Sequence, residues 1–532
     1  MYFCYYYIIS AMCRHMDQGY YNTNYRDITS VDIIFSLWML YVISRCCFPS
    51  FECCGLYPYC CIALCYLLMR RFRVYSTIVF AGIMCIGMWQ AALAIGQHFD
   101  RLNSSHRLFD ITGSFGNPGQ LGGFLAISII ATICMWSRFL KCRYAAWFFI
   151  PAAIQGYALV LSDSRAGWLS AMCGAIALWI LKRRKTRLNR NRLILLFVTL
   201  IIVIGGLYKY KPQSADGRLL VWRVTADMIA DKPILGHGIG GFNKNYMFYQ
   251  ADYFTEHPES AYSQYSDNIA YPYNEFLHVL ADQGIIGLVL ILGLLVAVLK
   301  TPANNNEYKA AIIGYIVFAQ FSYPSYVPGL LVLFPILIAS IQSKPSVVSI
   351  PRCIHWGSVV FSIILFVYVG MEYSFRKECR ETIPQLFSAN PSKAAHARQF
   401  AEDHYHRLSG YPRMADVYGQ YVYAEGDPKR AMIVLKDLER IVPTSELFCD
   451  LGDLYKAEKD WNRALACYRT AYAMIPRRLT PVYKLFETYR DSGDTISARE
   501  QALKALSVPV RTEGTRTLRI KAEMKRYLAA TN

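Results

Sequence analysis

The sequence predicts an all-α protein, in which a bundle of about 11 or 12 membrane-spanning helices carries a large external loop and precedes a helical solenoid. The chain of 532 residues is 54% hydrophobic and only 18% charged, whereas soluble proteins usually carry about 25% charged residues. Apolar runs recur between residues 33 and 370, and charged residues become frequent afterwards. We therefore predict a polytopic membrane domain over residues 1–372 and a soluble domain over 373–532.

The predicted spans are apolar runs, several of them shorter than the ~20 residues that a helix needs to cross the hydrocarbon core. They are Ile33–Phe48, Phe51–Met69, Val74–Gly96, Pro118–Trp136, Tyr144–Leu161, Ala166–Leu181, Leu193–Tyr208, Gly284–Leu299, Ala310–Tyr323, Val327–Ile341 and Trp356–Gly370. The apolar segment Tyr2–Met12 is either a further span or the remnant of one. It has neither a basic start nor a small-residue cleavage site, so we do not expect a signal peptide.

The net charge of +18 is concentrated in alternate loops between these runs, near residues 70, 140 and 187. Lys and Arg residues beside spans stay on the cytoplasmic side. We therefore place these loops, together with those near residues 304 and 348, inside. We place the turns near 108 and 163, the loop 209–283 and everything after Gly370 outside. This placement predicts contact with membrane lipid and no nucleic-acid partner.

The C-terminal region repeats with a period near 34 residues. Asp427, Asp460 and Asp494 recur at steps of 33 and 34, and Ala431, Ala464 and Ala498 recur at the same steps. This spacing, together with Leu451–Tyr455 as a first-helix pattern, resembles the tetratricopeptide repeat. Such repeats stack into a solenoid with a concave binding face, so we expect a protein partner there. A plain helical domain is the alternative.

Two arginines in the predicted external segments are candidates for chemistry. Arg165 lies in a tight turn between two spans, where it either pairs with Asp163, anchors to lipid headgroups or clamps a phosphate, since guanidinium offers phosphate a planar fork of donors. Arg218 opens the long loop on a predicted helix that ends at Pro233, with Trp222 on the same face. It is either an exposed surface arginine or a second phosphate contact.

Three loop segments complete the pattern. Asn117 before Pro118 is a turn or helix-start signal. The four glycines of Gly236–Gly241 follow no strand, so they are a tight turn and not a nucleotide-binding loop. Tyr271–Leu277 leads back into the membrane, and its aromatic residues are suited equally to interface anchoring and to stacking on sugars.

Taken in order, these motifs resemble the O-antigen ligase and polymerase family of membrane glycosyltransferases. The family pattern has a Gly-x-Phe-x-Asn-Pro turn, a Ser-Arg turn, a Gly-Arg…Trp helix, a Pro-Ile-x-Gly-x-Gly-x-x-x-Phe loop and a His-Asn-x-x-Leu segment that runs into Gly-Ile-Ile-Gly. Here they correspond to Gly113–Pro118, Ser164-Arg165, Gly217–Trp222, Pro233–Phe242 and Tyr273–Gly287. Some family members also carry tetratricopeptide-like repeats at the C-terminus.

The resemblance implies a bacterial cytoplasmic (inner) membrane enzyme whose loop and C-terminal domain are periplasmic. It would be a metal-independent, inverting glycosyltransferase that moves a glycan from undecaprenyl diphosphate to a hydroxyl on another glycan, on lipid A core or on a protein. Arg165 and Arg218 would hold the diphosphate, whose developing charge needs stabilisation. We also assign Asn117, Trp222, Gly236, Gly238 and Asn274 to substrate binding, and we assign no cofactor.

This chain departs from the family pattern at Tyr273, where the family has a histidine proposed to activate the acceptor. Tyrosine, with a pKa near 10, is a poor base at neutral pH, so we assign Tyr273 only to the lining of the active site. The acceptor-activating group stays open among His257, Glu256, Glu259, His237, Glu275 and His278.

Two alternatives belong to other functional classes. A transporter or flippase of polyprenyl-linked glycan would need ionisable residues deep within the spans and an internal repeat of helices. A membrane-tethered scaffold that recruits envelope-assembly partners through its repeats would leave the two arginines and the long loop without a role.

Overall fold

The computed structural model describes residues 28–47, 55–183 except 73, 105 and 107, 198–199, 202, 205–341, 352–408, 411–508 and 514–531. Within these residues all regular structure is helical, as the sequence predicts. The predicted segment Tyr2–Met12 and most of the predicted span Leu193–Tyr208 lie outside the described residues.

The apolar part of the chain folds into two groups of helices. The first group is α2 (Ser30–Cys47), α3 (Leu56–Phe72), α4 (Ser76–His98), α5 (Pro118–Phe139), α6 (Phe149–Leu161) and α7 (Arg165–Lys182). The second is α11 (Glu275–Leu299), α12 (Asn306–Ala319), α13 (Pro328–Leu331), α14 (Leu333–Ala339) and α15 (Arg352–Thr382). By length and composition, four segments of the described chain can cross a membrane: α4, α5, α11 and Gly357–Phe387.

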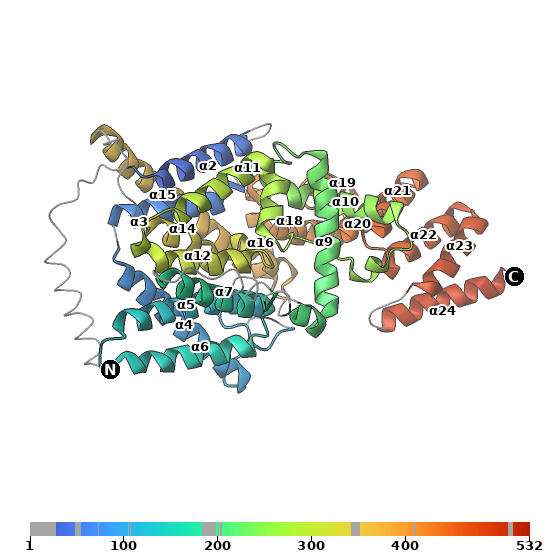
Figure 1. Cartoon of the computed structure of the whole chain (residues 1–532). Helices are drawn as coiled ribbons and strands as arrows, with labels where there is room; N and C mark the ends of the chain where they lie inside the picture. Colours follow the sequence, from blue (N-terminus) through green and yellow to red (C-terminus); the bar gives the residue numbers. More distant parts are fainter. Residues whose placement is uncertain are drawn as a thin grey trace.

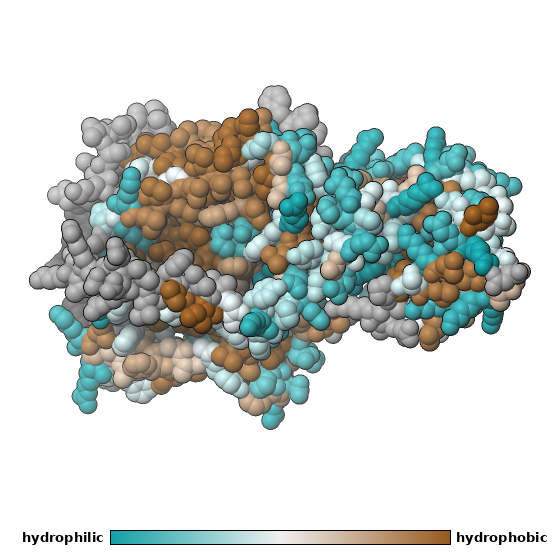
Figure 2. Space-filling view, turned by 45° about the vertical axis from the view of Figure 1, so that its right-hand side comes forward, coloured by the Kyte–Doolittle hydropathy of each residue, from teal (hydrophilic) through white to brown (hydrophobic). Residues whose placement is uncertain are grey.

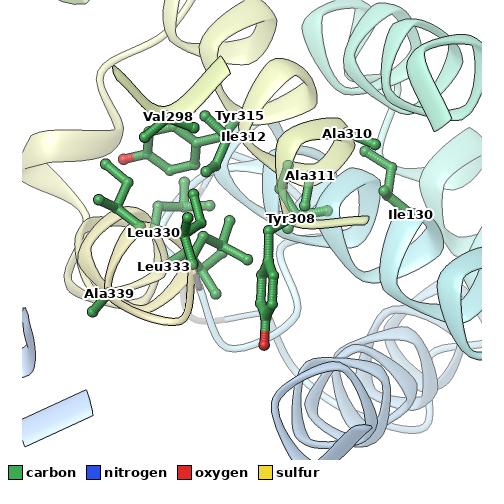
Figure 3. Packing of buried hydrophobic residues seen from close by; sticks show 14 of the residues in the cluster. Ile130, Val298, Tyr308, Ala310, Ala311, Ile312, Tyr315, Leu330, Leu333 and Ala339 are labelled. Atoms are coloured by element: carbon green, nitrogen blue, oxygen red, sulfur yellow. The ribbon is translucent and has the colours of Figure 1, made fainter. Parts of the chain in front are cut away.

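Helix α5 lies at the centre of this bundle and packs against α4, α6, α7 and α12. The side chain of Ile130 enters a gap left by two glycines: a Cβ added at Gly174 or Gly314 would lie 2.1 or 2.4 Å from its terminal carbon. Small residues allow helices in membranes to approach closely. Figure 3 shows Ile130 beside Ala310, with Tyr315, Leu330 and Leu333 in the same buried cluster.

The outer surface of the bundle is apolar as well. Trp89 is 64% exposed, Val289 59% and Phe366 65%. Figure 2 shows a broad hydrophobic surface over this part and a mostly hydrophilic one over the helices that follow α15. Apolar patches of this extent mark surfaces that are covered by a partner or by lipid. With the four apolar helices, this surface identifies a membrane protein.

Ion pairs gather at one end of the bundle. Arg138, at the end of α5, donates from Nε to Glu307 Oε2 at 2.6 Å, and Lys182, at the end of α7, lies 2.9 Å from Glu307 Oε1. Arg70, at the end of α3, donates to Asp32 at 2.7 Å. Helices α5 and α7 start at the other end of the bundle, at Pro118 and Arg165. Helix α5 has 22 residues and is therefore about 33 Å long. The basic ends and the predicted site are thus separated by the full length of the helices.

The predicted loop 209–283 is largely helical. It contains α9 (Pro212–Asp231), α10 (Gly241–Glu256) and the short 3-10 helix η3 (Ala261–Tyr265). The helix that the sequence predicts around Arg218 is therefore present. Figure 1 shows α9 beside the apolar helices, with the last helices of the chain, drawn in red, on its other side. Buried side chains of α9 and α10 form one cluster with Phe448 and Met474, which belong to the C-terminal helices.

Residues beyond α15 form a series of short amphipathic helices, here named the C-terminal helices. They are η6 (Ile383–Phe387), α16 (Pro391–Asp403), α17 (Tyr405–Leu408), α18 (Pro412–Glu425), α19 (Pro428–Glu439), α20 (Ser445–Ala457), α21 (Trp461–Met474), α22 (Leu479–Ser492), α23 (Thr495–Ser507) and α24 (Thr515–Ala530). Helix α15 continues through residue 372, where the sequence analysis places a domain boundary.

The sequence period has a local cause. Asp427, Asp460 and Asp494 each precede a helix and accept hydrogen bonds from backbone N–H groups of its first turn, as N-cap residues do. The alanines four residues later are buried, and each of these helices packs against the preceding one. The repeated residues thus start alternate helices and allow their close packing.

Candidate functional site

A cavity of about 660 Å³ opens where the ends of four segments meet, and we name it the arginine cavity. It is bordered by the start of α5, the turn before α7, helix α9 and the segment before α11. Its polar lining residues include Asn117, Asp163, Lys211, Arg218, Asp267 and Tyr273. Pockets of this size bind small molecules or the recognised part of larger ones.

Arg218 is the half-buried cation of this cavity. Its Cζ lies 5.7 Å from the centre of the Tyr273 ring, and no carboxylate among the described residues forms an ion pair with it. Burial, and then the positive charge of Arg165, lower the pKa of Arg218 from its ordinary value. An arginine nevertheless stays protonated at neutral pH. A partly buried guanidinium without an anionic partner is costly, so the cavity is suited to an anion.

Arg165 contacts the chain next to the cavity but does not line the cavity itself. Its Nη1 donates to the carbonyl oxygens of Leu207 at 2.7 Å and Lys211 at 3.1 Å, so it fixes the chain that leads into α9. Asp163, which the sequence analysis considers as its ion-pair partner, pairs with Lys211 instead. Arg165 is not among the lining residues, and it reaches the cavity through its charge.

Tyr273 borders the cavity in a strained backbone conformation. Its φ is +53°, and Asp163, which also lines the cavity, has a φ of +49°, a region that costs a residue with a side chain about 1 kcal/mol or more. Such outliers cluster at functional sites. Burial, and then the neighbouring Tyr271, raise the pKa of Tyr273, so its phenol is neutral at physiological pH.

Four tyrosines, here named the tyrosine wall, lie between two cavities: Tyr273 and Tyr323 line the arginine cavity, and Tyr271 and Tyr326 line a second one. Tyr271 stacks on Tyr323 with ring centres 4.1 Å apart, and Tyr273 meets Tyr323 edge-on at 5.5 Å. The ring centre of Tyr326 lies 4.8 Å from that of Tyr271. The second cavity, the inner cavity, has a volume of about 490 Å³ and is lined by residues of α11 and α12 together with residues of α2, α3, α10 and several other segments.

The inner cavity contains a polar network around His278. The sequence analysis names only His278 and Glu275 of this network, as candidates for the acceptor-activating group. His278 is 8% exposed; its Nδ1 lies 3.4 Å from Glu275, and its Nε2 lies 3.4 Å from Asp282 and 3.1 Å from the Tyr326 hydroxyl. Glu275 also accepts hydrogen bonds from Ser325. The spacing of three and four residues on one apolar helix is the signal that predicts such a cluster. His278 and Glu275 line the inner cavity and not the arginine cavity.

The glycine turn packs against a break in α11. Gly284 interrupts that helix with a φ of +66°, and the turn replaces the missing helical hydrogen bonds: His237 and Gly238 donate to the carbonyls of Ala281 and Asp282. A Cβ on Gly236 would lie 2.5 Å from the carbonyl carbon of Asp282. Neither Gly236 nor Gly238 lines the arginine cavity.

The other predicted site residues hold elements in place. Asn117 caps α5 through a 2.7 Å bond from Gly119 and also lines the arginine cavity. Asn274 caps α11 and donates to the carbonyl of Gln320. Trp222 donates from Nε1 to the carbonyl of Pro272 at 3.0 Å, which fixes the residue before Tyr273.

The structure thus brings Asn117, Arg218 and Tyr273 to one cavity, supported from outside by Arg165, Trp222 and Asn274. It adds Lys211 and Asp267, which the sequence analysis does not identify. These two lie in segments without a recognisable motif. His237 and His257, two of the open candidates for a base, bond to the carbonyls of Met228 and Tyr253 and do not line this cavity.

Residues 150–292 match the model of the O-antigen ligase family. The chain is also 28% identical over 190 residues to a Rickettsia bellii protein named "Putative polysaccharide ligase" and 29% identical over 189 residues to one of that kind from Rickettsia conorii. Each match covers 31% of this chain and 44% of the relative, so the chain matches less than half the length of these relatives. The matched region begins in α6 and ends in α11, and it includes Arg165, Arg218 and Tyr273. Similarity to the O-antigen ligase family therefore covers the helices and loops that build most of the arginine cavity.

Proposed function

We propose that this protein transfers a glycan from an undecaprenyl-diphosphate carrier to an acceptor hydroxyl at the outer face of the bacterial cytoplasmic membrane. The observation that carries this proposal is Arg218, a half-buried cation without an anionic partner among the described residues, in a cavity that also contains Lys211. A diphosphate is the anion that a guanidinium fork recognises well.

The proposed reaction is a displacement at the anomeric carbon of the carrier-linked glycan. The acceptor oxygen attacks the anomeric carbon, the bond from that carbon to the diphosphate oxygen breaks, and the diphosphate keeps the bonding electron pair. Configuration at the carbon is inverted. Arg218, with the charge of Arg165 behind it, stabilises the negative charge that develops on the leaving group. The tyrosine wall provides flat aromatic faces for the sugar rings. As the new bond forms, the acceptor hydroxyl releases its proton to solvent water, which balances the step without a protein base.

The arrangement of the helices supports an outer location of the site. The basic ends of α3, α5 and α7 lie opposite the cavity, as cytoplasmic ends do. The proposed periplasmic part then comprises residues 209–283 and the residues after α15. We propose that the C-terminal helices form a tetratricopeptide-like solenoid that docks a protein partner.

Complementation of a deletion strain tests the function. Arg165→Ala and Arg218→Ala should each abolish glycan transfer at unchanged protein level, while Arg223→Ala, an exposed residue on the same helix, should retain it. Mass spectrometry of lipid-linked, lipid A-linked and protein-linked glycans identifies the acceptor. In the deletion strain, single repeat units left on the carrier indicate that the protein is a polymerase. Polymer retained on the carrier indicates a lipid A ligase, and missing protein glycans indicate a protein transferase.

Purified protein in detergent separates this proposal from a transporter or a scaffold. A transferase forms product from carrier-linked glycan and acceptor without a sealed membrane, whereas a flippase or a scaffold does not. Full transfer by both arginine variants would contradict the diphosphate role.

A further inference from the structure

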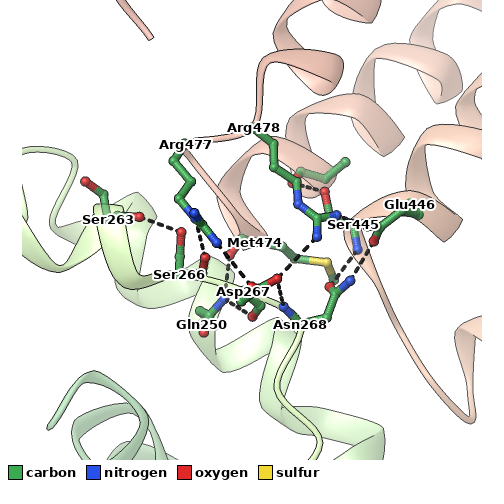
Figure 4. Close-up of polar contacts among 11 residues, drawn as sticks. Gln250, Ser263, Ser266, Asp267, Asn268, Ser445, Glu446, Met474, Arg477 and Arg478 are labelled. Carbon is green, nitrogen blue, oxygen red and sulfur yellow. Dashed lines mark hydrogen bonds and ion pairs between the residues drawn. The ribbon is translucent and has the colours of Figure 1, made fainter. Parts of the chain in front are cut away.

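One wall of the arginine cavity is held by the C-terminal helices. Tyr265, Asp267 and Ile269 line the cavity, and we name residues 265–269 the wall segment. Figure 4 shows Arg477 and Arg478, from the turn between α21 and α22, pointing toward Asp267. These arginines are about 210 residues away in sequence, so the cavity is completed by a distant part of the chain.

The contacts form a two-arginine clamp. Arg477 donates from Nε to the carbonyl of Ser266 at 2.6 Å and from Nη2 to Asp267 Oδ2 at 3.1 Å. Arg478 donates from Nη2 to Asp267 Oδ1 at 3.3 Å, and its Nη1 pairs with Glu446. The two guanidinium groups therefore engage both oxygens of one carboxylate, an arrangement that fixes direction as well as charge.

Buried backbone contacts reinforce the clamp. The fully buried amide of Gln250 donates from Nε2 to the carbonyls of both Asp267 and Met474, at 3.1 and 2.7 Å. Asn268 donates to Glu446 at 2.6 Å. The wall segment is thus tied to α10, α20 and the end of α21 at once, and its position depends on the docked C-terminal helices.

The clamp also sets the charge of the cavity. Asp267 shares the cavity with Arg218, and its negative charge acts on Tyr273. An unscreened carboxylate would repel a bound diphosphate and could attract Arg218 away from it. The positive charges of Arg477 and Arg478 balance the negative charges of Asp267 and Glu446.

We propose that Arg477 and Arg478 are positioning residues of the donor site, which hold the wall segment and neutralise Asp267 so that a polyprenyl diphosphate binds beside Arg218. This inference rests on the proposed function. It makes the C-terminal helices part of the substrate site and not only a docking surface.

Steady-state kinetics of the purified full-length protein test the clamp, with undecaprenyl-diphosphate-linked glycan as donor. The double variant Arg477→Ala/Arg478→Ala should raise KM for the donor about 10-fold or more, with kcat changed much less, because the removed charges act on binding. The increase should shrink at high ionic strength, where part-exposed charges are screened. Arg463→Ala, an exposed arginine of α21, serves as the control and should leave KM unchanged.

Asp267→Asn in the double-variant background separates charge from structure. If the clamp neutralises Asp267, this third substitution should return KM most of the way to that of the parent protein. An unchanged KM in the double variant, or a raised KM that Asp267→Asn does not restore, would overturn the inference. Arg477→Gln/Arg478→Gln removes the charges but keeps donor groups, and it answers the same question if the alanine variant does not fold.

The failure of the clamp and the failure of the proposed function give different results. If Arg218→Ala abolishes transfer and the clamp variants do not affect KM, only the clamp inference falls. If Arg218→Ala retains full transfer, the diphosphate role falls, and the clamp inference, which rests on it, falls with it.

Discussion

The guanidinium of Arg218 lies over the ring of Tyr273, with 5.7 Å between Cζ and the ring centre. Arg218 belongs to α9. Tyr273 has a strained backbone and immediately precedes the N-cap residue of α11. A cation over an aromatic face is held in place without losing its donors. The contact therefore orients Arg218 while its N–H groups stay available to an anion in the cavity.

Arg218→Lys should reduce kcat/KM for glycan transfer about 100-fold or more, because lysine keeps the charge but loses the planar fork. The thermal unfolding midpoint of the purified protein should change little, since no carboxylate among the described residues pairs with Arg218. Arg223→Lys on the exposed face of α9 is the matched control and should behave as the parent protein. Equal kinetics for the two lysine variants would exclude bidentate recognition by Arg218.

Tyr273→Phe should retain at least about a tenth of the activity, because the phenol is not the base that activates the acceptor. Burial raises the pKa of Tyr273, so the hydroxyl stays protonated up to at least its ordinary pKa near 10. The pH profile of kcat/KM should therefore have the same shape in parent and variant between about pH 6 and 10. Loss of an alkaline or neutral limb in the variant would show that the phenol titrates in the reaction.

Local signals explain which parts of this site the sequence predicts. Asn117-Pro118 starts a helix because an amide side chain caps it and proline suits its first turn. The helix around Arg218 follows from its amphipathic pattern, and Asp427 and its repeats follow from capping. Each of these needs only neighbours within a few residues.

The remaining features depend on contacts between distant segments. The stacking of Tyr271 on Tyr323 joins the segment before α11 to the residues after α12. The partner of the glycine turn is the break of α11 at Gly284, over forty residues later. The clamp of Asp267 by Arg477 needs the C-terminal helices to be docked. No local pattern marks such pairs, so the sequence analysis does not identify the contact of Gly236 with this helix break. The assignment of Gly236 to substrate binding stays a prediction.

Gly236→Ala should lower the free energy of unfolding by about 2–4 kcal/mol, since it combines a φ of +66° with a clash. The added Cβ would lie 2.5 Å from the carbonyl carbon of Asp282, and that backbone cannot move easily. Gly240→Ala is the matched control: its φ is +76°, but nothing lies within 4 Å of its Cβ. Gly240→Ala should lower the free energy of unfolding by only about 1 kcal/mol. Denaturation of both variants measures the steric part as the difference between them.

Glu307→Gln should destabilise the bundle by about 3 kcal/mol, because it leaves two cations without their shared anion. The Glu307 side chain is 10% exposed and pairs with both Arg138 and Lys182. Asp227→Asn removes an exposed, 3.9 Å pair on α9 and should cost less than about 0.5 kcal/mol. Thermal unfolding in one detergent gives the comparison. Equal losses in the two variants would mean that the shared pair does not stabilise the end of the bundle.

Asp450 makes the stability of the C-terminal helices depend on pH. Burial, and then the negative charges of Asp453, Asp416 and Glu446, raise its pKa to about 7. An unfolded aspartate has a pKa near 4, so between about pH 4 and 7 the folded state binds more protons than the unfolded state. Stability therefore falls as pH rises through this window, and the full cost is present above about pH 7.

Asp450→Asn removes the ionisable group and should raise the unfolding midpoint of the C-terminal helices at pH 8, with little effect at pH 4. The gain should be of the order of 1–3 kcal/mol, because each unit of pKa shift corresponds to about 1.4 kcal/mol and Asp450 is only partly buried. Calorimetry of the full-length protein across this pH range measures it, with the exposed Asp403→Asn as control. A gain of equal size at both pH values would assign the effect to packing, since only the ionised carboxylate carries the penalty.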